Sequence, residues 1–129
     1  VKAFRQALYI ENKTFALWHN PNKTMYSLHQ AVADPKLGNE PVNCVTLEKF
    51  LVDNKLDHVD FMKLDIEGSE AEIFAHSSFR DVAGKIDTII FETHSWSGRH
   101  PNQIKDSLTS LGFKLNQLPA DASLWAATR

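Results

Sequence analysis

The segment from Val42 onward alternates between helix and strand patterns, and this alternation constrains the fold more than any other feature of the chain. The predicted order is helix, strand, helix, strand, helix and two final strands. Alternation of this kind is typical of a parallel β-sheet with helices on both faces. We therefore expect an α/β fold with a mostly parallel sheet that ends in an antiparallel hairpin. In such sheets, ligands bind at the carboxyl ends of the strands.

Capping residues and chain breakers mark the boundaries of these elements. Thr46 predicts the start of a helix that carries Leu47 and Leu51 at helical spacing. The stretch Ser69-Glu70-Ala71-Glu72 predicts a capping box at the start of the next helix, and Pro101 predicts the first turn of a third. The expected strands are residues 59–65, 86–92, 113–118 and 123–127. The apolar run Ile89-Ile90-Phe91 favours a strand that is covered on both faces.

The first 41 residues follow a different pattern from the rest of the chain. Residues 1–8 and 14–18 are predicted to form a hairpin, with its turn at residues 11–13. Residues 20–42 contain Pro, Asn and Gly and predict a long, partly irregular connection. We expect residues 1–129 to be one partial domain. It consists of a strand, hairpin and loop region, 1–41, followed by an α/β half, 42–129.

Composition excludes several classes of partner. The net charge is -2 and no run of basic residues is present, which argues against nucleic-acid binding. No apolar stretch approaches the roughly 20 residues that a membrane-spanning helix needs, so we expect no membrane partner. Cys44 is the single cysteine, which excludes an internal disulfide and fits a cytoplasmic location.

Acidic residues and a histidine follow two of the predicted strands. Asp65 ends the strand at 59–65 and Glu67 follows it, while Glu92 ends the strand at 86–92 and His94 follows that one. If these strands are neighbours, their side chains meet at one rim, together with Lys63 from the same strand face as Asp65. Crowded groups of this kind shift each other's pKa values and supply a general base near neutral pH.

Two other interpretations of this rim remain open. The positive end of the following helix favours acidic residues, so Asp65 and Glu67 also fit a purely structural role. The same side chains could hold a hard divalent cation. Zinc is disfavoured because the chain lacks closely spaced Cys and His ligands. We expect no metal, because the carboxylates are explained without one.

Two further features bear on ligands. The five glycines are far apart, so the chain contains neither G-x-G-x-x-G nor a P-loop. Trp96 lies in a predicted loop just after His94. It could cover a bound substrate by stacking on a sugar or a ring, and a plain packing role explains it equally well.

The central motif carries a family resemblance. The stretch Val59-Asp60-Phe61-Met62-Lys63-Leu64-Asp65-Ile66-Glu67-Gly68-Ser69-Glu70 resembles the signature "idllKiDvEGaE" of FkbM-type methyltransferases. The flanking stretches at residues 45–51, 89–94 and 111–113 are also similar to the family, and so are Ala7-Leu8 and Ser27. The resemblance covers nearly the whole chain, but only the later part of the family domain.

The resemblance implies a Rossmann-like class I methyltransferase fold with S-adenosylmethionine as methyl donor and a hydroxyl of a sugar or natural product as acceptor. By position, it implies cofactor binding by Gln6, Ala7 and Asp65. We expect Asp65 or His94 to take the hydroxyl proton, and Glu67, Glu92 and Trp96 to bind the acceptor. Strands one and two of the family, with the glycine turn and the ribose-binding acid, are not matched. We therefore expect these 129 residues alone to bind the cofactor weakly or not at all.

Two alternatives come from other functional classes. One is a non-catalytic interaction module that pairs with a partner through an open sheet edge. The other is a metal-dependent phosphohydrolase with Asp65 as nucleophile, which is disfavoured because no second phosphate-binding element is visible.

Overall fold

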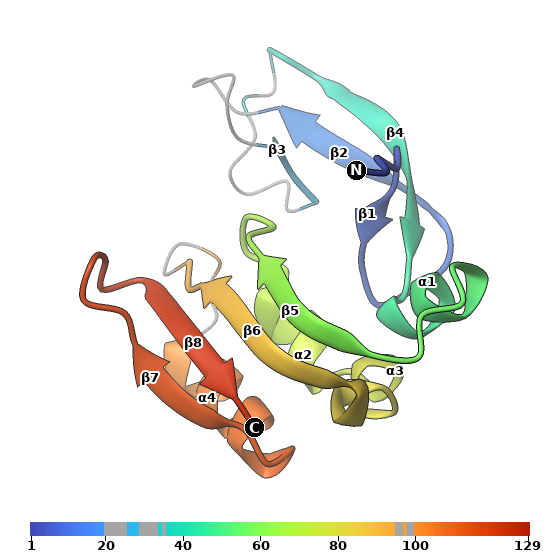
Figure 1. Cartoon of the computed structure of the whole chain (residues 1–129). Coiled ribbons are helices and arrows are strands. Elements are labelled where there is room, and N and C mark those ends of the chain that lie inside the picture. The colour runs from blue at the N-terminus through green and yellow to red at the C-terminus, as the bar shows by residue number, and fades with distance from the viewer. Residues whose placement is uncertain (20–25, 29–33, 35, 95–96, 98–99) are drawn as a thin grey trace.

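The computed structural model describes residues 1–19, 26–28, 34, 36–94, 97 and 100–129. The described strands form two four-stranded sheets (Figure 1). The first has the order β1-β4-β2-β3 and the second the order β5-β6-β8-β7. The strands of the first sheet are β1 (Ala7–Leu8), β2 (Thr14–His19), β3 (Tyr26–Ser27) and β4 (Asn39–Val45). Those of the second are β5 (Val59–Leu64), β6 (Ile86–Glu92), β7 (Lys114–Gln117) and β8 (Leu124–Thr128).

The helices lie between these strands in the chain. They are α1 (Leu47–Asp53), α2 (Glu70–Ala75), α3 (Ser77–Arg80), the short 3₁₀ helix η2 (Ala83–Lys85) and α4 (Pro101–Ser110). The Thr46 hydroxyl caps α1 by accepting the backbone N–H of Lys49 at 3.2 Å, as its sequence pattern predicts. Pro101 begins α4, and Gly112, with a φ of 86°, follows the end of that helix.

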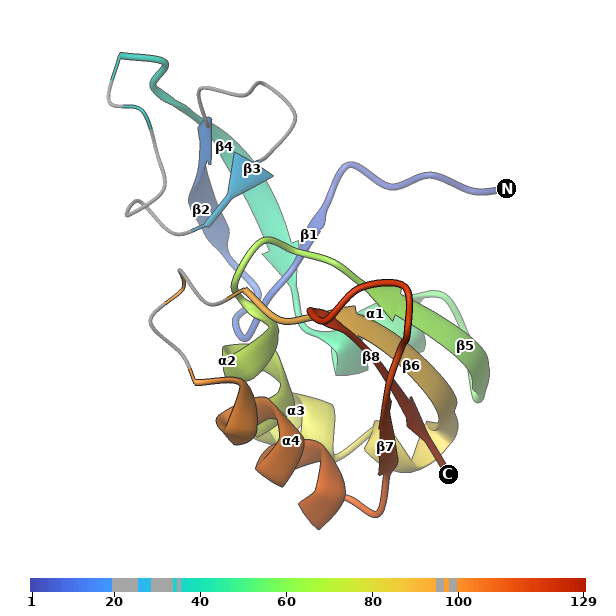
Figure 2. The same cartoon turned by 90° about the vertical axis from the view of Figure 1, so that its left-hand side faces the viewer.

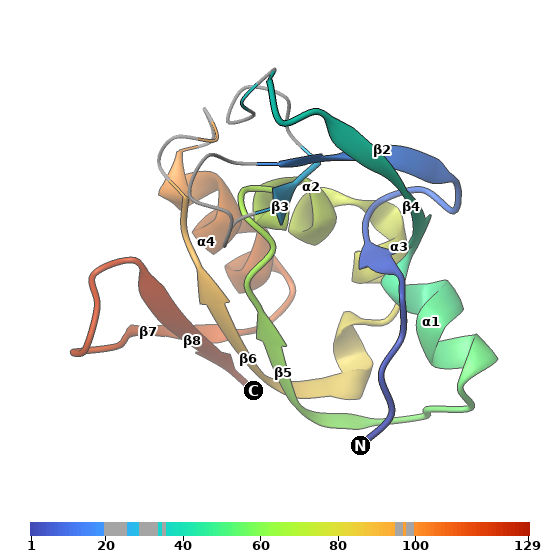
Figure 3. The same cartoon turned by 90° about the horizontal axis from the view of Figure 1, so that it is seen from above.

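The α/β class is confirmed, but the expected mostly parallel sheet is wrong. Among the described strands, β1 with β4 and β5 with β6 are the parallel pairs, and the other pairs are antiparallel. No described strand joins β1 to β5, so the sheet is divided, and β2 and β8 run antiparallel to both of their neighbours in the two parts. Figure 3 shows β1 and β5 apart from each other, with no strand drawn between them. The antiparallel C-terminal hairpin of β7 and β8 is confirmed.

The N-terminal hairpin also differs from the prediction. β1 pairs in parallel with β4, and β2 pairs antiparallel with β4 rather than with β1. The end of the expected irregular connection thus becomes a strand, although it contains Pro41. β1 pairs only with Cys44 and Val45, so Pro41 lies where β4 has a described neighbour on one side only. A proline, which lacks a backbone N–H, is tolerated at such an edge.

A core of aromatic and aliphatic side chains lies between the second sheet and its helices. Figure 2 shows α2, α3 and α4 on one face of this sheet. Phe74 is fully buried, and its ring meets those of Phe79 and Phe91 edge-on at centroid distances of 4.9 Å and 5.4 Å. Helices cover one face of the sheet, so Ile89 and Phe91 are buried whereas Ile90 is half-buried. The expectation that both faces are covered is therefore wrong for the described residues.

Candidate active site

A left-handed turn follows β5 and carries the acidic motif. Glu67 and Gly68 have φ values of 55° and 100°. Glycine adopts this conformation without a steric penalty, whereas a residue with a side chain pays about 1–3 kcal/mol. The turn directs the chain from the carboxyl end of β5 into α2. A glutamate held in this conformation marks the turn as a functional candidate, because strain of this kind is concentrated at such sites.

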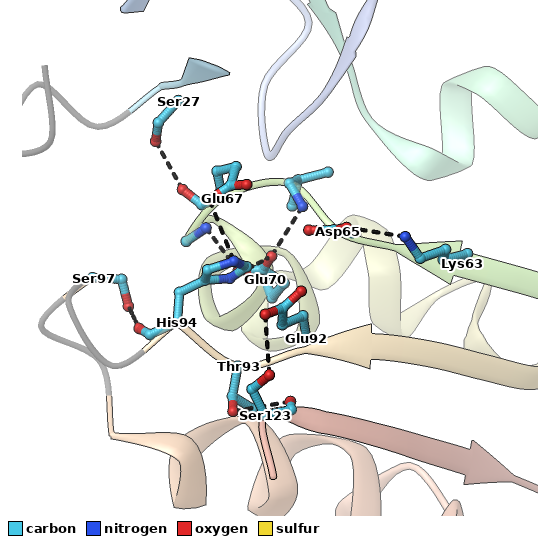
Figure 4. Close-up of polar contacts among 12 residues, drawn as sticks. Ser27, Lys63, Asp65, Glu67, Glu70, Glu92, Thr93, His94, Ser97 and Ser123 are labelled. Atoms are coloured by element: carbon cyan, nitrogen blue, oxygen red, sulfur yellow. Dashed lines mark hydrogen bonds and ion pairs between the residues drawn. The ribbon is translucent and has the colours of Figure 1, made fainter. Parts of the chain in front are cut away.

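The carboxylate of Glu70 holds this turn from inside. One oxygen accepts the backbone N–H of Ile66 and the other accepts that of Gly68, each at 3.0 Å (Figure 4). The Glu70 side chain is only 1% exposed. The predicted capping box is wrong here, because Ser69 makes no side-chain cap hydrogen bond. Glu70 instead accepts the backbone N–H groups of the turn. The sequence did not predict this role, because Glu70 lies inside the expected capping box.

Ser27 reaches the same turn from the first sheet. Its hydroxyl donates a hydrogen bond to the backbone carbonyl of Glu67 at 2.8 Å, and the residue is buried. The contact therefore joins β3 to the turn after β5, 40 residues further along the chain. The spacing of these residues gave no hint of this role, because it depends on how the two sheets meet.

His94 lies between two glutamates of the turn and of α2. Its Nε2 is 3.4 Å from Oε2 of Glu67, and its Nδ1 is 3.2 Å from Oε1 of Glu70. The His94 side chain is 7% exposed. Burial alone lowers the pKa of His94, but the Glu70 contact and nearby carboxylate charges outweigh burial and raise the pKa above 6.5. Those carboxylates belong to Glu70, Glu67 and Glu92.

The other acidic groups of the rim have defined partners. Burial raises the pKa of Glu67 above its ordinary value; the charge of His94 opposes this shift, and neighbouring carboxylates add to it. Asp65 forms an ion pair with Lys63 at 3.0 Å. Glu92 accepts a hydrogen bond from the Ser123 hydroxyl at 3.0 Å, a partner from the loop before β8 that the sequence did not indicate.

The predicted rim is therefore brought together. One ligand atom each of Asp65, Glu67 and His94 lies within 4.8 Å of the other two, an arrangement that could hold a divalent cation. A second group of the same kind, His58, Asp60 and Asp87, is exposed. In the rim both ring nitrogens of His94 face carboxylates. A doubly protonated, positively charged ring therefore fits the geometry, and no metal cation is needed to balance the carboxylates.

A cavity of about 240 Å³ lies beside this rim, between the first sheet and the segment after β5. Its walls include all three predicted cofactor residues: Gln6 just before β1, Ala7 in β1 and Asp65 just after β5. The remaining lining residues are Leu8, Leu17, Leu28, Ile66 and Ser69. Because pockets for whole ligands measure about 300–1,000 Å³, this cavity suits part of a cofactor. Trp96, the predicted substrate cover, lies outside the described residues.

Comparison with known proteins yields a family match. The model of the methyltransferase FkbM domain matches residues 5–115, which is most of the chain. Searches of curated proteins and of solved structures return no match. Among the described helices, none is long and apolar enough to cross a membrane. The matched range contains the turn, His94 and all three predicted cofactor residues, and the chain belongs to the FkbM methyltransferase family.

Proposed function

We propose that the parent protein transfers the methyl group of S-adenosylmethionine to a hydroxyl oxygen of a sugar or another small molecule. The observation that carries this proposal is the cavity shared by Gln6, Ala7 and Asp65. Gln6 and Ala7 lie at the start of β1 and Asp65 follows β5, so chain segments distant in sequence meet at one site. The family of methyltransferases to which the chain belongs supports the same reaction class.

The residues around the cavity would have two roles: some would bind the cofactor and others would bind and deprotonate the acceptor. Gln6, Ala7 and Asp65 would hold the cofactor, which supplies an electrophilic methyl group when bound. Asp65 or His94 would take the proton of the acceptor hydroxyl. Glu67 and Glu92 would orient the acceptor, since both lie at the same rim. The protein mainly aligns two reactants, a contribution that can lower the barrier by about 7–11 kcal/mol.

We also propose that a further pair of strands completes the Rossmann-like sheet between β1 and β5. Residues of β1 and β5 line a shared groove of about 290 Å³, so the insertion of two strands, each about 4.8 Å from its neighbours, would move the two sheets apart. The residues that line this groove include Ala7, Leu8, Met62 and Leu64. No glycine turn exists in the sequence to bind the methionine end of the cofactor. The added strands would supply that turn and make the sheet continuous.

The open edge of β5 also favours a second candidate, a non-catalytic interaction module. Phe61 on this strand is 60% exposed, and an exposed sheet edge is a template for pairing with another chain. Under this alternative the rim would be a structural remnant and the cavity would have no affinity for the cofactor.

Calorimetry on the 129-residue chain separates the candidates. The cell receives S-adenosylmethionine in one titration and magnesium chloride in another. Methyl transfer predicts heat from millimolar S-adenosylmethionine and no cofactor-independent magnesium binding. Magnesium binding that Asp65→Asn abolishes would support the metal-dependent phosphohydrolase instead. Absence of heat from both ligands would favour the interaction module.

A further inference from the structure

We propose that Glu70 is the positioning residue of this site: its buried carboxylate fixes the turn that carries Asp65 and holds His94 as an imidazolium, which leaves Asp65 to accept the proton of the acceptor. The choice of Asp65 rests on the proposed methyl transfer. The charge of His94 does not depend on the proposed function.

The first argument is the number of contacts that Glu70 makes. Its two oxygens accept the N–H groups of Ile66 and Gly68, and Oε1 also lies 3.2 Å from Nδ1 of His94. A carboxylate that is 1% exposed is costly unless it is paired and hydrogen-bonded. These three contacts satisfy Glu70. They also tie the turn after β5 to the segment after β6.

The second argument comes from the two nitrogens of the His94 ring. Nδ1 faces Glu70 and Nε2 faces Glu67, both carboxylate oxygens. A neutral imidazole has one N–H and one lone pair, so one of its nitrogens would point a lone pair at a carboxylate. An imidazolium is a cation, so it forms a favourable ion pair with each of the two carboxylates. It also reduces the negative charge of a buried cluster.

The described charged groups around His94 act in the same direction. Glu67 comes from the turn, Glu70 from α2 and Glu92 from the end of β6, and all three raise the pKa of His94. Asp65 is within 4.8 Å of His94 and is itself paired with Lys63. An imidazolium has no lone pair with which to accept a proton. His94 is therefore not the base, and Asp65 is the carboxylate that lines the cavity.

The test is a histidine-ring titration of the 129-residue chain by two-dimensional ¹H–¹⁵N NMR, from about pH 5 to about pH 9. His94→Gln assigns the signal. We expect the titration midpoint of His94 to lie above pH 6.5 in the wild type. At pH values below that midpoint, the two ring nitrogens should have similar ¹⁵N chemical shifts. We expect Glu70→Gln to lower that midpoint and to shift the amide signals of Ile66 and Gly68. The matched control is Glu48→Gln on the exposed side of α1, which should change none of these signals.

A wild-type midpoint at or below 6.5 would overturn the proposal, and so would an unchanged midpoint in a folded Glu70→Gln variant. Should Glu70→Gln not fold, the wild-type titration decides alone. Ring nitrogens with distinct, neutral-form shifts at pH 6 would also contradict it, because His94 would then be a neutral imidazole. None of these readouts requires the cofactor, so a failed methyl-transfer proposal would be recognised separately.

Discussion

The hydroxyl of Ser27 lies 2.8 Å from the backbone carbonyl of Glu67 and donates a hydrogen bond to it. The acceptor belongs to a residue with a φ of 55°, and the donor belongs to the other sheet. One hydrogen bond thus stabilises a strained turn and joins the two halves of the molecule at the site.

Replacing Ser27 with Ala should destabilise the chain by about 1–3 kcal/mol, because the Glu67 carbonyl loses a buried partner. Urea unfolding followed by circular dichroism measures this change. Ser110→Ala is the matched control: Ser110 also donates to a backbone carbonyl, that of Ser107, but it is exposed. We expect less than about 0.5 kcal/mol for the control. Equal effects of the two variants would show that the Ser27 contact has no special role.

With the sheet completed as proposed, Asp65→Asn should reduce methyl transfer by about 10²–10⁴-fold, the usual contribution of a general base. The isosteric amide cannot accept the proton, yet it keeps the shape of the side chain. Transfer of a labelled methyl group measures the effect, and circular dichroism verifies the fold. Asp57→Asn, at an exposed position before β5, should leave turnover unchanged. Turnover that Asp65→Asn leaves intact would remove Asp65 from the mechanism.

The stability of the chain should fall as the pH rises through the raised pKa of His94. The imidazolium contributes its full stabilisation below the unfolded-state pKa of 6.5, and this contribution is lost as the pH passes the higher folded-state pKa. The pKa of Glu67 is also raised, so its effect has the same sign at lower pH, above 4.5. Urea unfolding at several pH values should show a smaller decline for His94→Gln. An identical decline in both proteins would contradict the assignment.

Tyr9→Phe should destabilise the chain by about 1 kcal/mol. The Tyr9 hydroxyl donates to Glu72 on α2 at 2.8 Å and links the segment after β1 to that helix. Burial and the Glu72 contact raise the pKa of Tyr9 to about 12. An ultraviolet titration should therefore lose a step near pH 12 in the variant. Thr14→Val, which removes an exposed hydrogen bond to Asn43, serves as control. A step that persists in Tyr9→Phe would show that it belongs to another group.

The later half of the fold follows from local signals. Thr46, Pro101 and Gly112 mark helix boundaries that the structure confirms, because caps and breakers act within a few residues. Sheet partners were predicted less well, since pairing depends on distant segments. β1 pairs with β4 rather than β2, and nothing local distinguishes these choices.

In the candidate site, too, positions set by local signals were predicted, and contacts between distant segments were not. Asp65, Glu67 and His94 were predicted to meet because each follows a strand, and the structure brings them within 4.8 Å. Ser27 and Ser123 were missed, because their contacts arise only when the sheets and loops meet. Glu70 was visible inside the expected capping box of Ser69 and Glu72, but no role of its own was predicted for it. Its burial against His94 could not be read from spacing alone.

The central claim is that the cavity beside Asp65 is the cofactor site of a methyltransferase. The most direct measurement is a ¹H–¹⁵N NMR titration of the 129-residue chain with S-adenosylmethionine. We predict millimolar affinity, with the largest shifts at the amides of Gln6, Ala7 and Asp65, because the 240 Å³ cavity accommodates only part of the cofactor. Micromolar affinity would contradict the predicted weak binding. Shifts concentrated around the exposed His58 group, or no shifts at about 10 mM cofactor, would contradict the site itself.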